Sequence, residues 1–255
     1  GNRSCFRRSR YRRPPLQLFF VGALLALATA PDVLAEWKTQ TVELRFEYPD
    51  WKEVSGAEAD IADRMKEYPD KFKEQSALEV MEDYSGAKEF GLDSKVKAAA
   101  IDLIPKYFAE IAQKFSDAGF PEPTYLPKNA DGDYLIYIYD FKTSYYDMIP
   151  LDMDVKGIGA RITPPCTKFR RQSGEKGLYA INSRYMLQKD GITSDAKRQY
   201  LYSTIAHELF HAVQNMEELN QNLDACSSNT TWSVATASAV GVWMAQEKYG
   251  DGYFR

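Results

Sequence analysis

The two histidines of the chain lie four residues apart, in the sequence HELFHAVQ at residues 207–214. On an α-helix this spacing places them one turn apart on the same face, so that both imidazoles can bind one ion. Zinc accepts neutral imidazole nitrogens and keeps a position for water, whose pKa it lowers towards about 7. A neighbouring carboxylate can take the proton of that water. The motif therefore predicts a zinc site with His207 and His211 as metal ligands and Glu208 as the catalytic general base.

The residues around the motif predict the helix that it requires. The segment GITSD supplies capping residues for a long helix that we expect to begin near Ser194. Apolar residues then recur every four positions and predict a core-facing stripe that brackets the histidines: Leu201, Ile205, Leu209 and Val213. HExxH is short enough to occur by chance, and the alternative is a helix whose histidines are surface residues or hydrogen-bonded core residues.

Strands and further helices are predicted upstream of this helix. Alternating or β-rich runs predict strands at 41–48, 134–141, 159–163 and 178–183. Residues 55–93 are charged and weakly periodic, and we expect short helices there. A helix with one apolar face begins at Ser94; Pro105 is expected to kink or split it, and Gly119 followed by Pro121 to end it. Strands followed by a long helix, without βαβ alternation, predict an α+β fold.

The first 35 residues have the pattern of a secretory signal peptide. Six arginines in residues 1–15 precede an apolar run at 16–30, which is shorter than the roughly 20 residues of a membrane-spanning helix. Cleavage is expected after Ala35, and the alternative is a retained membrane anchor. We therefore expect a secreted or periplasmic protein without a membrane contact once the signal is removed.

The charge of the chain limits its binding partners, and its cysteine content bears on disulfide formation. Residues 1–35 hold six of the 32 basic residues and one of the 36 acidic ones, so the rest of the chain has a net charge of −9. This disfavours nucleic acid and anionic lipid, which need clustered positive charge. Cys166 and Cys226 are the thiols that remain, and an oxidising compartment predicts one disulfide between them. Two separate reduced cysteines are the alternative.

The sequence also resembles a known family. TIAHELFHAVQ, with LYAINS before it and TWSVATASAVGVW after it, resembles the secreted bacterial zinc peptidases of the gluzincin type, close to immune-inhibitor-A-like and thermolysin-like enzymes. The upstream run AGFPEPTYLPKNADGDYLIYIYDF resembles the part that enters their catalytic sheet. The resemblance covers roughly residues 94–245. It implies a zincin-like α+β fold, with a mixed sheet whose edge strand packs on the HExxH helix and a second, mainly helical lobe. It further implies that LYAINS is this edge strand and pairs with an extended peptide substrate.

One departure from that family concerns the third zinc ligand. Gluzincins have a second helix with a glutamate ligand and, four residues later, an aspartate that orients a histidine. Aligning ATASAVG with that segment puts Val234 in the glutamate position and Ser238 in the aspartate position, and a register based on Trp243 puts Ser238 in the ligand position. Neither side chain replaces a carboxylate ligand. The remaining candidates for a third donor are acids near the motif or beyond it: Glu217, Asp224 and Glu247.

Together these patterns predict three parts and one function. We expect a signal peptide at 1–35, an N-terminal segment at 36–93 that is a propeptide or a lid, and a zincin-like catalytic domain at 94–255 that is truncated at its C-terminus. The expected function is an exported zinc endopeptidase that hydrolyses protein or peptide substrates with a metal-activated water. The alternatives are an inactive zincin-fold binding protein without the third ligand and a structural module.

Overall fold

The computed structural model of the 255-residue chain covers the predicted elements around the motif. The residues that it describes are 36–54, 57–67, 69, 74–84, 92–139, 160–163, 176–183, 187, 192, 194–221 and 231–250. The predicted signal peptide, Cys166, Cys226 and Asp224 lie outside these residues. The prediction of a disulfide and that of a cleaved signal therefore stay predictions.

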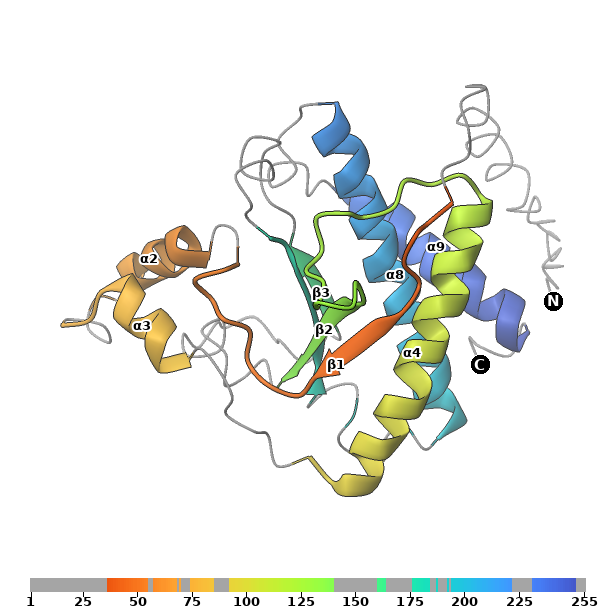
Figure 1. The fold of residues 1–255 in the computed structure, drawn as a ribbon, viewed down its shortest axis with the longest axis horizontal. Helices are drawn as coiled ribbons and strands as arrows, with labels where there is room; N and C mark the ends of the chain where they lie inside the picture. Colours follow the sequence, from red (N-terminus) through yellow and green to blue (C-terminus); the bar gives the residue numbers. More distant parts are fainter. Residues whose placement is uncertain are drawn as a thin grey trace, which may run out of the picture. The chain divides into compact units, whose positions relative to one another are not determined.

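Four strands form one sheet in the order β1-β2-β4-β3, which is drawn at the centre of Figure 1. They are β1 (Val42–Arg45), β2 (Tyr134–Tyr139), β3 (Ala160–Thr163) and β4 (Leu178–Asn182). β1, β2 and β4 are parallel, and β3 runs antiparallel to β4. All four predicted strands are thus confirmed within the described residues, and the fold is α+β. No βαβ connection was expected from the sequence. β1 and β2 are nevertheless parallel neighbours, and helices lie between them in the chain.

The expectation that LYAINS is an edge strand is wrong. β4 lies inside the sheet, where Ile181 is the register partner of Ile138 in β2 and of Ala160 in β3. All five residues of β4 are buried, as is typical of a strand covered on both faces and both sides. The edges of the described sheet are β1 and β3, and β3 contacts helix α8 (Asp195–Asn220).

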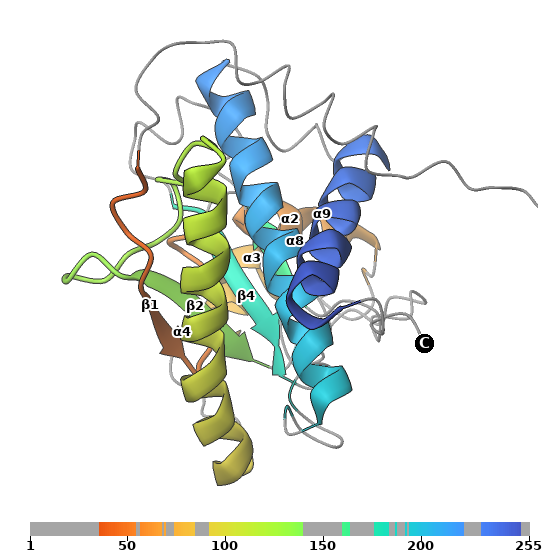
Figure 2. The same cartoon turned by 90° about the vertical axis from the view of Figure 1, so that its right-hand side faces the viewer.

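Helices cover both faces of the sheet. Figure 2 shows α4 (Ser94–Asp117), α8 and α9 (Thr231–Tyr249) side by side in front of the strands, with α2 (Ala57–Glu67) and α3 (Ala77–Tyr84) behind them. The short helices expected in 55–93 are therefore confirmed. None of the helices in the described residues has both the length and the apolar character that a membrane span requires.

The strands divide their side chains between two cores because successive residues of a strand point to opposite faces. In β4, Tyr179 and Ile181 join the core under α4 and α8, whereas Leu178 and Ala180 join the core under α2 and α3. The second core also contains Trp51, which is fully buried. The segment before residue 94 thus contributes strand β1 and most of the second, smaller core, while its role as a propeptide or lid stays a prediction.

Helix α4 begins and ends where the sequence predicts. The Asp93 side chain accepts hydrogen bonds from the backbone N–H groups of Lys95 and Val96 and so caps the first turn. At the other end Gly119 has φ 80°, and the N–H of Phe120 donates to the carbonyl of Phe115, which is the glycine-based helix stop.

Pro105 does not split α4, which continues through it. The apolar face of the helix is buried against the sheet on both sides of the proline, at Ile104 and Phe108 among others. Burial of a large apolar side chain contributes about 1.5–3 kcal/mol. Such packing before and after the proline offsets the one helical hydrogen bond that its ring removes.

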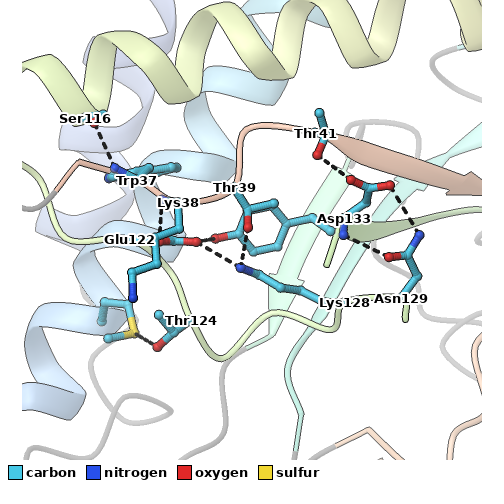
Figure 3. A network of polar contacts seen from close by, with 12 residues as sticks. Trp37, Lys38, Thr39, Thr41, Ser116, Glu122, Thr124, Lys128, Asn129 and Asp133 are labelled. Atoms are coloured by element: carbon cyan, nitrogen blue, oxygen red, sulfur yellow. Dashed lines mark hydrogen bonds and ion pairs between the residues drawn. The ribbon is translucent and has the colours of Figure 1, made fainter. Parts of the chain in front are cut away.

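A polar network fastens the chain before β1 to the turn after α4, as Figure 3 shows. The Glu122 carboxylate accepts hydrogen bonds from the Lys38 backbone N–H at 2.9 Å, from Lys128 Nζ at 2.9 Å and from the Tyr134 hydroxyl at 2.8 Å. Lys128 Nζ also donates to the Thr39 hydroxyl at 2.9 Å. The Glu122 side chain is only 11% exposed, so these bonds replace most of its water.

This network shifts the titration of Glu122. Partial burial alone raises the pKa of its carboxyl group, but the hydrogen bonds from Lys128, the Lys38 N–H and Tyr134 together outweigh burial and hold the pKa below 4.5. A carboxyl whose pKa is lowered by folding stabilises the native state above its unfolded pKa. That stabilisation is lost as the pH falls through the folded pKa.

We therefore expect Glu122→Gln to lower the free energy of unfolding at pH 7 by about 1.5–3 kcal/mol, because charge-assisted hydrogen bonds are lost. Below pH 4.5 the difference from the wild type should shrink, since the wild type then loses the same interaction. Urea unfolding between pH 3 and pH 7 measures both effects. Glu82→Gln, in an exposed pair with Lys52, is the control and should change little. A pH-independent difference would contradict this account.

Candidate metal centre

Helix α8 carries the HExxH motif, and its position follows from the predicted apolar stripe. The helix begins after Ser194, whose hydroxyl accepts the backbone N–H of Lys197 at 3.3 Å. The stripe is buried in the core as predicted, at Leu201, Ile205, Leu209 and Val213. The motif residues therefore lie at the border of this buried stripe, with Glu208 at 9% exposure.

The two imidazoles face each other through their Nε2 atoms, which are 3.1 Å apart. The ring centroids are 4.7 Å apart and the ring planes cross at 79°. Two zinc–nitrogen bonds of about 2.0–2.1 Å at a tetrahedral angle span about 3.4 Å, so the His207 and His211 nitrogens are within a few tenths of an ångström of a chelating arrangement. The same distance also fits a hydrogen bond from one ring to the other.

Burial keeps both rings neutral near pH 7. It lowers the pKa of His207 to about 4, and the proximity of His211 adds to the effect. Burial also lowers the pKa of His211, although the hydrogen bond with Gln214 opposes part of this shift. Neutral imidazole is the form that offers a lone pair to a metal.

Glu208 lies beside this pair, with its Oε1 atom 4.0 Å from His207 Nε2. Burial raises the pKa of the Tyr125 and Tyr179 hydroxyl groups, and the negative charge of Glu208 adds to both shifts. The Tyr125 hydroxyl accepts a hydrogen bond from Asn215 Nδ2 at 3.4 Å. The carboxylate thus lies in a weakly solvated environment, in which electrostatic interactions with a nearby ion are strengthened.

Helix α9 approaches α8 closely at the level of His207. A Cβ atom built on Gly241 would lie 2.5 Å from the backbone oxygen of Ser203 and 3.3 Å from His207 Cβ, so glycine is required for this contact. One turn earlier on α9, Ser238 Oγ lies 3.4 Å from His207 Nδ1. A hydroxyl at this distance can exchange a hydrogen bond with His207 Nδ1 as donor or as acceptor.

The far end of α9 is held by a lysine among tyrosines. Lys248 Nζ pairs with the Glu110 carboxylate of α4 and lies 5.0 Å from the ring centroid of Tyr202. The Tyr249 hydroxyl donates to the Tyr107 hydroxyl at 2.9 Å. Ion pairing and cation–π attraction thus fix the C-terminal half of α9 against α4 and α8.

The described residues do not supply a third acidic ligand. No group of three His, Cys, Asp or Glu side chains that could hold an ion occurs in the described part of the chain. Glu217 is exposed, and α8 continues past it to Asn220 instead of turning back. Glu247 pairs with Lys114 of α4 at 2.9 Å. Val234, in the expected ligand position, is an exposed side chain with 42% of its surface accessible.

Sequence reasoning missed two contacts of the site that cross from α8 to α9. Gln214 forms hydrogen bonds with both His211 and Thr236, and Gly241 packs against the backbone oxygen of Ser203. The sequence does contain a signal for each contact: Gln214 is a polar residue one turn after His211, and Gly241 is a glycine within an apolar helix. Neither signal names its partner, because the partner depends on how the two helices cross.

No protein-family model, curated protein or solved structure matches the chain.

The close helix contact gives a test of the site geometry. Gly241→Ala places a methyl group against the Ser203 backbone oxygen, which cannot rotate away, so the helices must separate. We expect a loss of about 1–3 kcal/mol in the free energy of unfolding, despite the roughly 1 kcal/mol gain in helix propensity of alanine over glycine. Denaturant unfolding measures the change. Ala235→Leu on the exposed face of α9 is the control, with about 0.5 kcal/mol or less. A more stable Gly241→Ala variant would show that the helices do not touch here.

Proposed function

We propose that this chain is an exported zinc-dependent peptidase whose metal is held by His207 and His211 and whose general base is Glu208. The observation that carries the proposal is the pair of neutral imidazoles with Nε2 atoms 3.1 Å apart, beside a buried carboxylate 4.0 Å away. The resemblance around HELFHAVQ supports the same function. The acidic charge of the chain after residue 35 agrees with a protein or peptide substrate in preference to nucleic acid.

The donor set fits zinc. Two neutral imidazole nitrogens at this separation are what a tetrahedral zinc site takes from one helical turn, and a third protein donor completes catalytic sites of this kind. The third donor is proposed to lie outside the described residues, and Asp224 stays the candidate there. Zinc, when bound, supplies Lewis acidity: it polarises a carbonyl oxygen and makes water acidic near neutral pH.

The residues of the chain then have distinct tasks. Glu208 takes a proton from the attacking water on its carboxylate and gives it to the leaving amine, so that one group serves first as base and then as acid. The burial of Glu208, which is 9% exposed, limits the access of bulk water to that carboxylate. Ser238 holds the Nδ1 side of His207, which directs Nε2 into the site.

Strand β3 is the proposed docking edge for the substrate. It is an edge of the described sheet, runs antiparallel to β4 and contacts α8. An extended peptide that adds to this edge would form main-chain hydrogen bonds and lie along the helix that carries the histidines. This role replaces the one expected of LYAINS, whose hydrogen-bonding edges are already used within the sheet.

A second candidate function follows from Val234. An apolar side chain in the position expected for the third ligand favours a metal-free binding protein that keeps the helix pair and the open strand edge but performs no hydrolysis. The His207–His211 contact would then be a hydrogen bond between two neutral rings.

The enzyme proposal predicts a specific pattern of zinc content and activity. The wild type should retain about one zinc per chain after dialysis against zinc-containing buffer, and His211→Ala should lose it. Glu208→Gln should keep the zinc and lose activity on a denatured protein substrate by at least about 100-fold, since general-base catalysis contributes about 10²–10⁴-fold. Metal analysis and peptide release measure the two effects. Glu217→Gln, an exposed acid on the same helix, is the control and should keep both properties. Zinc-free wild-type protein would favour the binding protein.

A gain-of-ligand variant tests the placement of α9. Val234 precedes Ser238 by one helical turn, and Ser238 touches His207, so a glutamate at 234 is expected to reach the ion. We expect Val234→Glu to tighten zinc binding at least about tenfold, which corresponds to about 1.4 kcal/mol. Competition with a coloured chelator measures the affinity. Trp243→Glu changes another large, exposed hydrophobic residue of α9 and should have no effect. Equal affinities for the two variants would refute the alignment of α9 with the ligand helix.

A further inference from the structure

A chain of hydrogen bonds connects His211 to helix α9 through Gln214. His211 Nδ1 lies 2.9 Å from Gln214 Oε1. On its other side the Gln214 amide nitrogen donates to Thr236 Oγ1 at 2.8 Å and to the Ser233 carbonyl at 3.5 Å. The Thr236 hydroxyl donates in turn to the same Ser233 carbonyl at 3.0 Å. His211 is thus joined to the first turns of α9 by a single amide side chain.

The direction of this chain is set by the groups at its end. The carbonyl of Ser233 can only accept, so the single hydroxyl proton of Thr236 is used on it and Thr236 Oγ1 must accept from Gln214. The amide NH₂ group therefore faces α9 and the amide oxygen faces the imidazole. An amide turned the other way would place its oxygen against the Ser233 carbonyl and its NH₂ group against the ring.

The orientation of the amide determines which nitrogen of His211 carries the proton. Because Gln214 Oε1 only accepts, Nδ1 of His211 is the N–H donor, and in the neutral ring Nε2 then holds the lone pair. That lone pair is directed at the space between the two histidines, where Nε2 of His207 lies 3.1 Å away. The hydrogen bond also fixes the ring plane, as an outer partner does for a metal-binding histidine.

We propose that Gln214 is a positioning residue that holds His211 in its Nδ1–H tautomer, and that Thr236 of α9 anchors it in this role. The consequence for metal binding rests on the proposed function, whereas the tautomer of His211 can be observed in the metal-free protein. Gln214 and Thr236 couple the metal ligand of α8 to the docking of α9, so a shift of α9 would change the readiness of His211 to bind an ion.

Nuclear magnetic resonance of the full chain with ¹⁵N-labelled histidine tests this role, because the sequence contains two histidines and their signals are easily separated. The ¹⁵N shifts of the two ring nitrogens report which one carries the proton. In the wild type without metal we expect His211 as the Nδ1–H form. In Gln214→Met the acceptor is lost, and His211 should shift towards the Nε2–H form that imidazoles prefer in water. In Gln214→Glu, which keeps an acceptor, the Nδ1–H form should persist.

Two further variants keep the test decisive. Thr236→Val contacts neither imidazole through a hydrogen bond and should shift His211 in the same direction as Gln214→Met, by a smaller amount; it carries the test if Gln214→Met does not fold. Gln113→Met is the matched control, because it removes a hydrogen-bonded glutamine from the exposed face of α4, where it pairs with Gln40 and Asp117. The control should leave both histidines unchanged.

Zinc affinity of the same samples separates this role from the proposed function. If the wild type binds zinc, Gln214→Met should bind it about 10–100-fold more weakly, as expected when an outer partner of a ligand is removed. His211 remaining in the Nδ1–H form in Gln214→Met, with zinc affinity within about twofold of the wild type, would overturn the role of Gln214 while leaving the zinc site intact. A wild type that binds no zinc would overturn the proposed function, and the tautomers would still decide the role of Gln214.

Discussion

The candidate centre depends on the close contact of α8 with α9 at Gly241. Helices usually pack with their axes 8–10 Å apart, at a distance set by the side chains between them. Here glycine lets a backbone oxygen of α8 approach the α9 backbone directly. This approach brings two short side chains of α9 within hydrogen-bonding distance of α8: Ser238 reaches His207, and Thr236 reaches Gln214. At a larger helix separation these α8 side chains would be hydrated instead. The orientation of both imidazoles thus depends on the contact between Gly241 and the Ser203 backbone oxygen, which involves neither ring.

Burial by the sheet and helices gives the centre its chemical character. The stripe of α8 that faces the core excludes water from one side of the motif, and Glu208 is only 9% exposed. Lowered histidine pKa values and a poorly hydrated carboxylate are consequences of the same exclusion, because a low dielectric disfavours added positive charge on imidazole and strengthens any interaction of the carboxylate with a cation. Core packing and site chemistry are therefore not separable here: weakening the stripe would hydrate the histidines as well.

The parts of this structure that the sequence predicted are those governed by local rules. The spacing of the histidines on one helical turn, the stripe from Leu201 to Val213 and the cap at Ser194 are properties of a single segment and were confirmed. The interior position of β4 was missed, since strand order depends on pairing with segments tens of residues away. Pro105 was expected to kink or split α4; the helix is not split, because the same apolar face packs on both sides of the proline.

The candidate site shows the same contrast between features of a single segment and contacts between distant segments. Glu208 and the two histidines were predicted as site residues from one short segment, whereas the contact of Gln214 with His211 was not predicted. Its partner Thr236 lies 22 residues further along and on another helix. A single chain carries no local sign of such a contact, because it arises from the angle at which two apolar helices meet.

The zinc-bound and metal-free interpretations differ by the place of one proton on His207. His211 presents a lone pair on Nε2 in either case, because Gln214 occupies its Nδ1 proton. If His207 donates its Nδ1 proton to the Ser238 hydroxyl, its Nε2 also has a lone pair, and two lone pairs 3.1 Å apart repel each other unless a cation lies between them. If Ser238 donates instead, His207 carries its proton on Nε2 and gives it to His211. A serine can do either, whereas an ionised aspartate in that place can only accept and would commit His207 to metal binding. With a hydroxyl at 238, the two histidines can therefore form a hydrogen bond to each other in the absence of metal. They can also bind a cation after the His207 proton moves from Nε2 to Nδ1. This proton shift costs free energy that a site with an aspartate would not require.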